Sequence, residues 1–372
     1  METSSLRGEA PSPRPGVLAV DPYVPGRSKL KGTGPVIKLS SNETPLGPSP
    51  RAVEAYREAA AHLDRYPDGG HSALRGALGA AHGLDPAQIV CGNGSDELFH
   101  VLAQAFLAPG DEAIYTEHGF LVYRIAILAA GATPVIAPER NLTADVHAIL
   151  QRVTPRTRAI FIANPNNPTG TYLSAEEVRF LRNALPDHVL LVLDGAYAEY
   201  VSNADYEAGI ELAASTQNTI MTRTFSKIYG LAAARIGWGY APAAVADAMN
   251  RIRSPFNLAG PSMAAAVAAL ADQAHIEHAR VHNVLWREKV TRELREMGYD
   301  VPESAANFVL IPFGTEPGRT AQDADEYLIG KRIITRQLSA YKLPNALRMT
   351  IGLEQENRAV LDALREFTKT LG

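Results

Sequence analysis

The chain contains 372 residues, of which 46% are hydrophobic and 20% are charged, and its formal net charge at pH 7 is −4. This composition is typical of a globular protein with two domains or one large one, and it excludes a disordered chain. The acidic balance argues against nucleic acid as the main partner. No stretch could cross a membrane, no secretory signal is recognisable, and the single cysteine, Cys91, points to a reducing cytoplasm.

The N-terminal segment is rich in proline and glycine. Nine of the 25 prolines lie within the first fifty residues. Proline fixes the backbone and removes a hydrogen-bond donor, so this segment cannot form long helices or central strands. We therefore predict an extended arm over residues 1–45 that lies over another part of the molecule.

From residue 46 to residue 260, helical and strand patterns alternate. Apolar strands that alternate with amphipathic helices are typical of a mostly parallel sheet with helices on both faces. A capping box of Ser174 and Glu177 marks one helix start. The expected helices are 52–63, 95–107, 121–131 and 173–185, and the expected strands are 88–93, 112–117, 133–138, 158–163, 188–194, 219–225 and 235–241.

From residue 261 to residue 372, the pattern changes. A long helical region, 263–298, is followed by apolar strands at 307–313, 332–338 and 346–352 and then by a closing helix. We predict a smaller C-terminal α+β domain here, so the whole chain is expected to be an α/β protein with an arm and two domains.

Polar residues follow several of the predicted strands, at the edge where parallel α/β sheets bind ligands. One of these segments, Gly94-Ser95-Asp96, opens a helix, whose first backbone amides favour an anion. Thr224 and Ser226 add hydroxyl groups, and Arg235 adds a permanent cation able to bind a phosphate with two hydrogen bonds. The sequence therefore predicts a site for a phosphorylated ligand.

Two charged residues beside this site suggest which ligand it is. Asp194 ends an apolar strand and needs a positive partner, which could be Lys227 or a protonated ring nitrogen of a cofactor. In the second case Lys227, partly desolvated beside Arg235, is free to form a Schiff base with an aldehyde. These features together describe pyridoxal 5'-phosphate. Asn167 and Tyr197 could bind its phenolic oxygen, Phe120 could stack on its ring, and no metal-ligand spacing is present.

The segments "NPNNPTG", "DGAYAEY" and "TRTFSKIYGLAAARIGWG" resemble those of the fold-type I aminotransferases. Further segments, such as "KLSSNETPLGPSP", "RYPDG" and "LPNALRMTIGLEQEN", are similar to the branch that acts on histidinol phosphate. The likeness runs from about Tyr23 to the C-terminus. It implies the fold-type I architecture of pyridoxal-phosphate-dependent transferases and amino transfer by two half-reactions, with glutamate and 2-oxoglutarate as one substrate pair and histidinol phosphate in the other.

The resemblance also implies residue roles. Lys227, Asp194 and Tyr197 are the catalytic residues, and Lys227 moves the proton at the substrate Cα. Tyr66 reaches the cofactor phosphate from the neighbouring subunit, which implies a homodimer with shared sites. The residues expected to contact substrate are Arg348 (α-carboxylate), Arg336 and Tyr23 (distal phosphate) and Asn42.

The chain departs from the family in one place near the site. The stacking residue lies in "EHGF" instead of a Pro-Thr-Tyr context, so Phe120 keeps the ring face and loses the hydroxyl. Two alternative activities remain open: an aromatic amino-acid aminotransferase, and a decarboxylase of a phosphorylated amino acid. A nicotinamide dehydrogenase is excluded because "CGNGSDE" lacks the third glycine of its fingerprint. A DNA-binding regulator is disfavoured because the arm is too broken for a helix-turn-helix.

Overall fold

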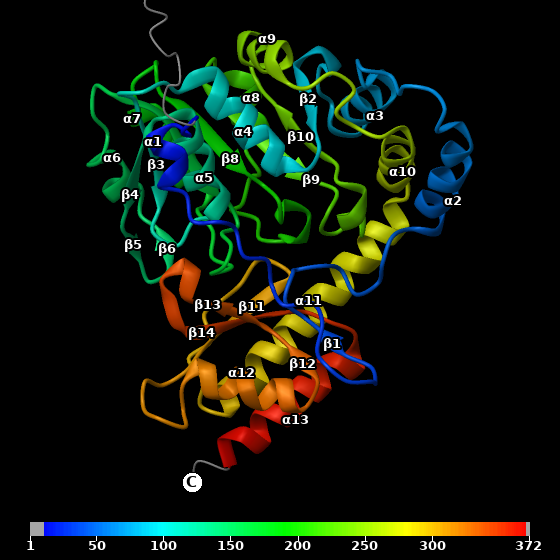
Figure 1. The fold of residues 1–372 in the computed structure, drawn as a ribbon, viewed down its shortest axis with the longest axis vertical. Coiled ribbons are helices and arrows are strands. Elements are labelled where there is room, and N and C mark those ends of the chain that lie inside the picture. Colours follow the sequence, from blue (N-terminus) through cyan, green and yellow to red (C-terminus); the bar gives the residue numbers. More distant parts are fainter. Residues whose placement is uncertain (1–10, 370–372) are drawn as a thin grey trace, which may run out of the picture.

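The computed structural model describes residues 11–369, so the first ten residues of the predicted arm lie outside the described part of the chain. A large domain with a seven-stranded sheet occupies the upper part of Figure 1, and a smaller domain lies below it. No helix within residues 11–369 has both the length and the apolar character of a membrane span.

The central sheet is parallel except for one strand. β10 runs antiparallel to both of its neighbours, and the other adjacent pairs are parallel. The chain passes from β9 to β10 through a short loop without a crossover helix, which only an antiparallel pair permits. This confirms the predicted mostly parallel α/β sheet. In spatial order its strands are β2 (Ile89–Gly92), β10 (Gly237–Tyr240), β9 (Thr219–Thr224), β8 (Leu190–Asp194), β7 (Thr157–Ala163), β3 (Glu112–Thr116) and β4 (Thr133–Ala137).

Helices cover both faces of this sheet because alternate residues of its strands face opposite sides. In β7, Phe161 belongs to the core beneath α4, α5 and α9, whereas Ile160 and Ile162 belong to the core beneath α6 and α7. The predicted capping box of Ser174 and Glu177 is present at the start of α7. The helices are α2 (Pro50–Ala59), α3 (Ser72–His82), α4 (Ser95–Phe106), α5 (Leu121–Ala130), α6 (Val146–Leu150), α7 (Ala175–Ala184), α8 (Ile210–Ser215), α9 (Ala243–Ile252) and α10 (Gly260–Ala271), with short 3-10 turns at Ala60–His62, Pro86–Gln88, Ala198–Tyr200 and Ala232–Ala234.

The long helical region predicted at 263–298 is two helices. α10 ends at Ala271, and Asp272 caps the next helix by accepting a hydrogen bond from the backbone of His275. Figure 1 shows α10 beside α2 in the large domain and α11 (Gln273–Glu296) descending to the small domain. We therefore propose a domain boundary near Asp272, twelve residues beyond the one expected from the sequence at 260.

The small domain packs helices against a three-stranded antiparallel sheet. The predicted strand 332–338 is divided into β12 (Ile333–Ile334) and β13 (Arg336–Leu338). A core that includes Trp286, Leu328 and Leu364 fills the space between sheet and helices. The other elements are β11 (Phe308–Pro312), β14 (Leu343–Thr350), α12 (Ala321–Gly330), α13 (Glu354–Lys369) and a 3-10 turn at Ser339–Tyr341.

The arm connects the two domains. Between residues 11 and 45 it contains only a short helix, α1 (Pro15–Leu18), against α5 and a two-residue strand, β1 (Ile37–Lys38), parallel to β12. Leu39 is buried in the small-domain core. The arm thus closes one side of the space where β7, β8 and β9 end.

A second small element, the hairpin β5 (Glu139–Arg140) and β6 (Thr143–Ala144), also lies outside the main sheet.

Candidate active site

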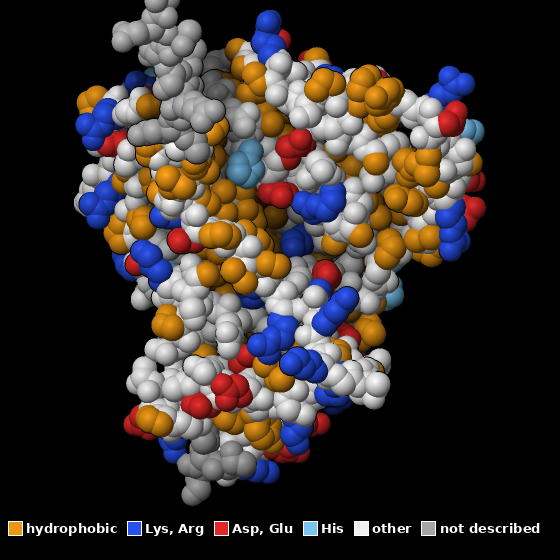
Figure 2. Space-filling model, in the orientation of Figure 1, with side chains coloured by type: hydrophobic (Ala, Val, Ile, Leu, Met, Phe, Trp, Pro, Cys, Tyr) orange, Lys and Arg blue, Asp and Glu red, His pale blue; other side chains and the backbone are white. Residues whose placement is uncertain are grey.

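A cavity of about 550 Å³ lies between the strand ends, the arm and the small domain. Figure 2 shows the corresponding hollow between the two domains, with acidic and basic side chains gathered in it. Four cationic side chains and two carboxylates line the cavity, so it suits an anionic ligand. It brings together Tyr23, Asn42, Ser95, Asp96, Phe120, Asn167, Asp194, Tyr197, Thr224, Ser226, Lys227, Arg235, Arg336 and Arg348.

The residues of the predicted anion site lie together at the start of α4. Gly94 precedes the helix with φ of 91°, and a Cβ atom there would lie 2.1 Å from a guanidinium nitrogen of Arg235. Arg235 donates hydrogen bonds to Asp96 Oδ1 at 2.7 Å and to Ser226 Oγ at 3.1 Å. A cation, a hydroxyl and the first amides of a helix therefore converge on one point. Gly94 is one of two predicted site residues that do not line the cavity. Because it has no side chain, it leaves room for the guanidinium of Arg235.

Asp194 is buried at the end of β8. Its Oδ2 accepts a hydrogen bond of 2.7 Å from the hydroxyl of Tyr123, and its Oδ1 accepts one of 3.1 Å from the backbone of Ala196. Burial raises the pKa of Asp194 to about 6, although both hydrogen bonds and the charge of Lys227 oppose this shift. Two positive partners were considered for Asp194: Lys227 and a protonated ring nitrogen of a cofactor. Within the described residues, Lys227 forms no ion pair with Asp194.

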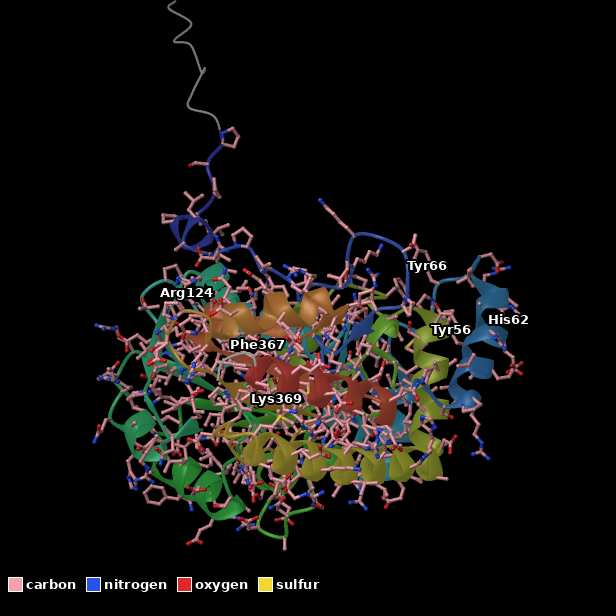
Figure 3. The ribbon with its side chains drawn as sticks, turned by 90° about the horizontal axis from the view of Figure 1, so that it is seen from below. Tyr56, His62, Tyr66, Arg124, Phe367 and Lys369 are labelled. Atoms are coloured by element: carbon pink, nitrogen blue, oxygen red, sulfur yellow. The ribbon has the colours of Figure 1, made fainter. Side chains whose placement is uncertain are left out.

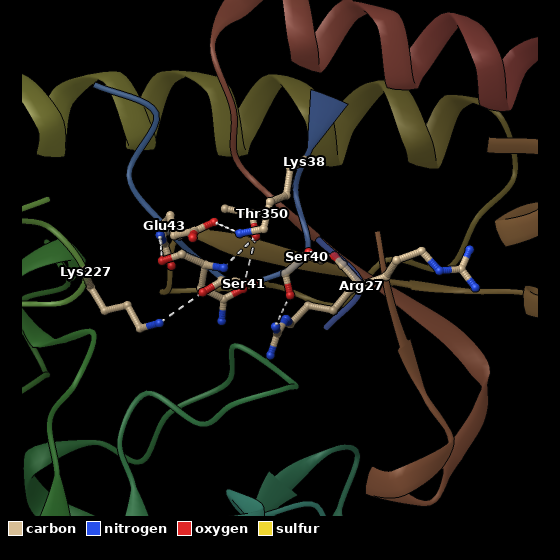
Figure 4. Close-up of polar contacts among 10 residues, drawn as sticks. Arg27, Lys38, Ser40, Ser41, Glu43, Lys227 and Thr350 are labelled. Atoms are coloured by element: carbon tan, nitrogen blue, oxygen red, sulfur yellow. Dashed lines mark hydrogen bonds and ion pairs between the residues drawn. The ribbon is translucent and has the colours of Figure 1, made fainter. Parts of the chain in front are cut away.

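Lys227 follows β9 and points into the cavity from the large domain. Its Nζ donates a hydrogen bond of 3.2 Å to the backbone oxygen of Ser41 in the arm (Figure 4). The ammonium also lies 5.7 Å from the centre of the Tyr197 ring. Burial, together with the positive charges of Arg348 and Arg235, lowers the pKa of Lys227 to about 8. A substantial fraction of this side chain is consequently the uncharged, nucleophilic amine near neutral pH.

A hydrogen-bond network links the arm to both domains. Asn42, held in the left-handed region with φ of 58°, donates from Nδ2 to the hydroxyl of Tyr197 at 2.8 Å. Its backbone N–H binds Thr350 Oγ1 at 2.9 Å. Arg348 donates to Asn167 Oδ1 and, at 2.9 Å, to the backbone oxygen of Ser40. Asn42 therefore stands beside Tyr197, and its polar groups are already engaged in holding the arm.

Two arginines of the small domain face each other across neighbouring strands. Arg336 of β13 and Arg348 of β14 are paired residues in the antiparallel register. Like charges directly opposite each other are unfavourable, and neither arginine forms an ion pair within residues 11–369. Arg336 donates to the backbone oxygen of Val24 at 2.8 Å, and Tyr23 beside it is half exposed. An anion between these side chains would relieve the repulsion.

Phe120 lies at the cavity wall, at the end of a loop that is anchored by hydrogen bonds between His118 and Glu139. His118 Nδ1 lies 2.8 Å from Glu139 Oε2, and the backbone N–H of His118 donates to the same carboxylate at 3.1 Å. The carboxylate is almost completely buried. The segment "EHGF" is thus held by a contact to β5.

Tyr66 is the second predicted residue that does not line the cavity. It is 84% exposed, and its ring stacks on Phe256 with 4.7 Å between centroids. Figure 3 shows Tyr56, His62 and Tyr66 along one outer edge of the molecule.

The residues in or beside the cavity that were not predicted from the sequence include Tyr123, Tyr341 and His100. Tyr123 and His100 occupy buried or partly buried helical positions, and that pattern predicts burial and not the partner of a polar group. Tyr341 lies in a 3-10 turn after β13, for which the sequence offered no signal.

Comparisons with known proteins agree with this geometry. Residues 34–364 match the family described as aminotransferase class I and II. The chain is 57% identical to a histidinol-phosphate aminotransferase of Nitrobacter winogradskyi and 55% identical to one of Rhodopseudomonas palustris; each match covers 96% of this chain and 98% of the relative. Among solved structures, histidinol-phosphate aminotransferase from Sinorhizobium meliloti in complex with pyridoxal-5'-phosphate has a TM-score of 0.84 and 29% identity, over 90% of this chain and 92% of that one.

Proposed function

Because the chain belongs to the class I and II aminotransferase family, we propose that it is a pyridoxal-phosphate-dependent histidinol-phosphate aminotransferase that exchanges an amino group with 2-oxoglutarate. Membership of the family confirms the resemblance inferred from the sequence motifs. The substrate assignment is supported by full-length relatives of that name. The observation that carries the proposal is a buried lysine with a lowered pKa in the same cavity as a buried carboxylate and an arginine-lined anion site.

The donor set of the cavity fits pyridoxal phosphate. Arg235, Ser226 and the first amides of α4 provide the charge and donors that a phosphate dianion needs. Asp194, with one further acceptor site on each oxygen, suits a protonated ring nitrogen. Phe120 offers a ring face at the cavity wall. When bound, the cofactor supplies an electron sink for the charge that develops at the substrate Cα.

In the proposed reaction, side chains of this protein bind and orient the ligands, and they move the protons. Lys227 Nζ would accept the proton from the substrate Cα and deliver it to C4′ of the cofactor, which requires an amine whose pKa lies near neutral pH. Burial keeps the pKa of Tyr197 above its usual value, so its hydroxyl remains a donor. It and the amide of Asn167 are available to a phenolic oxygen. Asp194 is 5% exposed, so few water molecules can reach its carboxylate.

The two cross-strand arginines support a pair of substrates whose anionic groups lie at different positions. Arg348 is buried beside Asn167 and suits an α-carboxylate such as that of glutamate. Arg336 lies closer to solvent beneath the arm and suits the distal phosphate of histidinol phosphate, together with Tyr23. An aromatic amino acid would leave Arg336 without an anionic partner.

We expect kcat/KM for histidinol phosphate to exceed that for phenylalanine by at least about 100-fold, because a site with an unpaired charge rejects ligands that lack the partner. The measurement is a substrate panel with 2-oxoglutarate as amino acceptor. Arg336→Gln should lose most of the preference, whereas Arg358→Gln, in an exposed pair on α13, should keep it. A preference for phenylalanine in the unaltered protein would assign the aromatic activity instead, and release of carbon dioxide from a phosphorylated amino acid in the panel would assign decarboxylation.

We further propose a homodimer in which Tyr66 completes the partner's phosphate site. The proposal is supported by an apolar groove of about 490 Å³ between α2, α3 and α10, and by the exposed side chains of Tyr66, Phe256 and Leu63 near it. Tyr66 is too exposed to be explained by packing within one chain.

Tyr66→Phe should therefore raise the dissociation constant of the cofactor about tenfold, the effect of one hydrogen bond to a charged group. Tyr56→Phe, on the same outer edge, is the matched control and should leave cofactor affinity unchanged. Fluorescence titration gives the affinity, and analytical ultracentrifugation gives the mass. A monomer in solution with unaltered cofactor affinity in the Tyr66 variant would contradict the dimer proposal.

We also propose that the protein works in the cytoplasm. Its single cysteine, Cys91, is buried as a free thiol, and burial raises its pKa to about 12, so no described residue depends on an oxidising compartment.

A further inference from the structure

Tyr123 touches both residues proposed to flank the cofactor ring, Phe120 and Asp194. It lies in the first turn of α5 and is completely buried. Its ring meets Phe120 edge to face at 5.8 Å, and its hydroxyl donates to Asp194 Oδ2 at 2.7 Å. Phe120 lies at the cavity wall and Asp194 at its floor, so Tyr123 supports the site from behind.

Neighbouring aromatic rings fix the position of Tyr123. Its ring stacks on Phe161 of β7 at 5.3 Å with an interplanar angle of 21°, and it meets Phe99 of α4 edge to face at 5.1 Å. A ring packed on several sides cannot rotate without opening the core. Its hydroxyl is consequently held at one point, which is where Oδ2 of Asp194 lies.

As a result, both carboxylate oxygens of Asp194 accept a hydrogen bond from a fixed donor. The backbone N–H of Ala196 binds Oδ1 at 3.1 Å, and Tyr123 binds Oδ2, so rotation of the carboxylate would break both contacts. A hydrogen bond donated to a carboxylate stabilises its ionised form. Burial acts in the opposite direction and raises the pKa of Asp194 to about 6. Without the tyrosine hydroxyl, burial would keep the carboxylate protonated to a higher pH.

We propose that Tyr123 is a positioning residue that holds Asp194 ionised and aimed at the cofactor ring nitrogen, an inference that rests on the proposed function. Tyr123 itself does not line the cavity. It acts through Asp194, and through the ring edge that supports Phe120. If Asp194 were protonated, it would give up its charge, and the ring nitrogen would lose the partner that keeps its own proton.

Other titratable groups also influence Asp194. The charge of Lys227 lowers the pKa of Asp194, and that of Asp96 in α4 raises it. The phenols of Tyr197 and Tyr206 lie close enough to respond to its charge. All four are retained when only the hydroxyl of Tyr123 is removed, so a Tyr123→Phe variant isolates one hydrogen bond.

The first test uses the cofactor-free protein in a phosphate-free buffer. Asp194 has a higher pKa in the folded than in the unfolded protein, so its contribution to stability falls as pH rises from its usual range through about 6. In Tyr123→Phe this fall should continue to higher pH. The loss in Tm relative to the unaltered protein should therefore be at least about 2 °C greater at pH 8 than at pH 5. Tyr206→Phe is the control, since that hydroxyl donates to a neutral carbonyl, Asn164 O, at 2.7 Å, and its loss in Tm should not depend on pH.

The second test adds pyridoxal phosphate. Tyr123→Phe should raise the dissociation constant of the cofactor about tenfold and shift the pH at which the absorption spectrum of the bound cofactor changes. The proposal requires both results. A Tm loss in Tyr123→Phe that is the same at pH 5 and pH 8, or a cofactor affinity and spectrum equal to those of the unaltered protein, overturns it. If the unaltered protein itself binds no pyridoxal phosphate, the proposed function fails, and the cofactor-free test still reports separately on the contact between Tyr123 and Asp194.

Discussion

Lys227→Ala is expected to lower the rate of amino transfer by at least about 10⁴-fold, because one side chain provides both the amine that bonds to the cofactor and the base that moves the substrate proton. The fold should survive the change. Lys227 makes a single hydrogen bond of 3.2 Å, to Ser41 O, and removal of a buried cation with a lowered pKa relieves desolvation.

The lowered pKa of Lys227 also predicts how its reaction with the cofactor depends on pH. With a pKa of about 8, about a quarter of Lys227 is free amine at pH 7.5, compared with about one in a thousand for an ordinary lysine. The rate at which the cofactor aldehyde attaches should therefore rise with pH and level off above about pH 8. Surface lysines should continue to gain reactivity up to about pH 10.

The measurement is borohydride reduction of the protein with bound pyridoxal phosphate, followed by peptide mass analysis, beside steady-state rates. A pyridoxyl mass is expected on the peptide that contains residue 227 and is expected to disappear in Lys227→Ala. The matched control is Lys289→Ala, whose ammonium lies over Trp286 on α11 outside the cavity lining. Retained transfer in the Lys227 variant, or modification at another lysine, would contradict the proposed mechanism.

Asp194→Asn is expected to lower kcat by about 10³-fold and at the same time to stabilise the cofactor-free protein. Asparagine has the shape of aspartate, and it can accept from Ala196 N and donate to the Tyr123 hydroxyl, which can rotate its proton. The geometry is thus preserved. What is lost is the negative charge that favours a proton on the cofactor ring nitrogen.

The stability effect follows from the raised pKa of Asp194. Its pKa is about 6 in the folded protein against a usual value of 3.8 for aspartate, so the ionised buried carboxylate destabilises the cofactor-free protein by about 3 kcal/mol at pH 8. This destabilisation grows as pH rises from about 4 to about 6 and is absent at lower pH, where the group is protonated in both states. The neutral variant should not show it.

Thermal unfolding of the cofactor-free protein between pH 4 and pH 8, together with kcat at saturating cofactor, measures both effects. Asp247→Asn is the matched control, since its partner Arg251 is exposed and the pair adds little to stability. The proposed role of the Asp194 charge is contradicted if the Asp194→Asn variant loses activity because it unfolds. It is also contradicted if kcat of this variant is unchanged.

The sequence by itself determined the local features of this protein. Residues with a strand period and helix caps such as Ser174 and Glu177 fixed where most elements lie, because such signals depend on neighbours in the chain. Since parallel strands end at one edge of a sheet, the polar residues after them were expected to meet. Asp194, Lys227 and Arg235 do line one cavity. The break at Asp272 was not predicted, because a one-residue interruption barely disturbs a helical period.

Only the tertiary structure decided which polar groups meet across the chain. Tyr123 and Asp194 are 71 residues apart, and Asn42 and Tyr197 are 155 apart; these pairs form because the sheet order and the path of the arm bring them together. The cross-strand meeting of Arg336 with Arg348 depends on strand register, which the loop between them does not reveal. The pKa shifts also depend on the tertiary structure. The sequence shows which side chains can carry a charge. Desolvation moves the pKa values of Lys227 and Asp194 toward neutral pH only when the domains and the arm enclose these side chains.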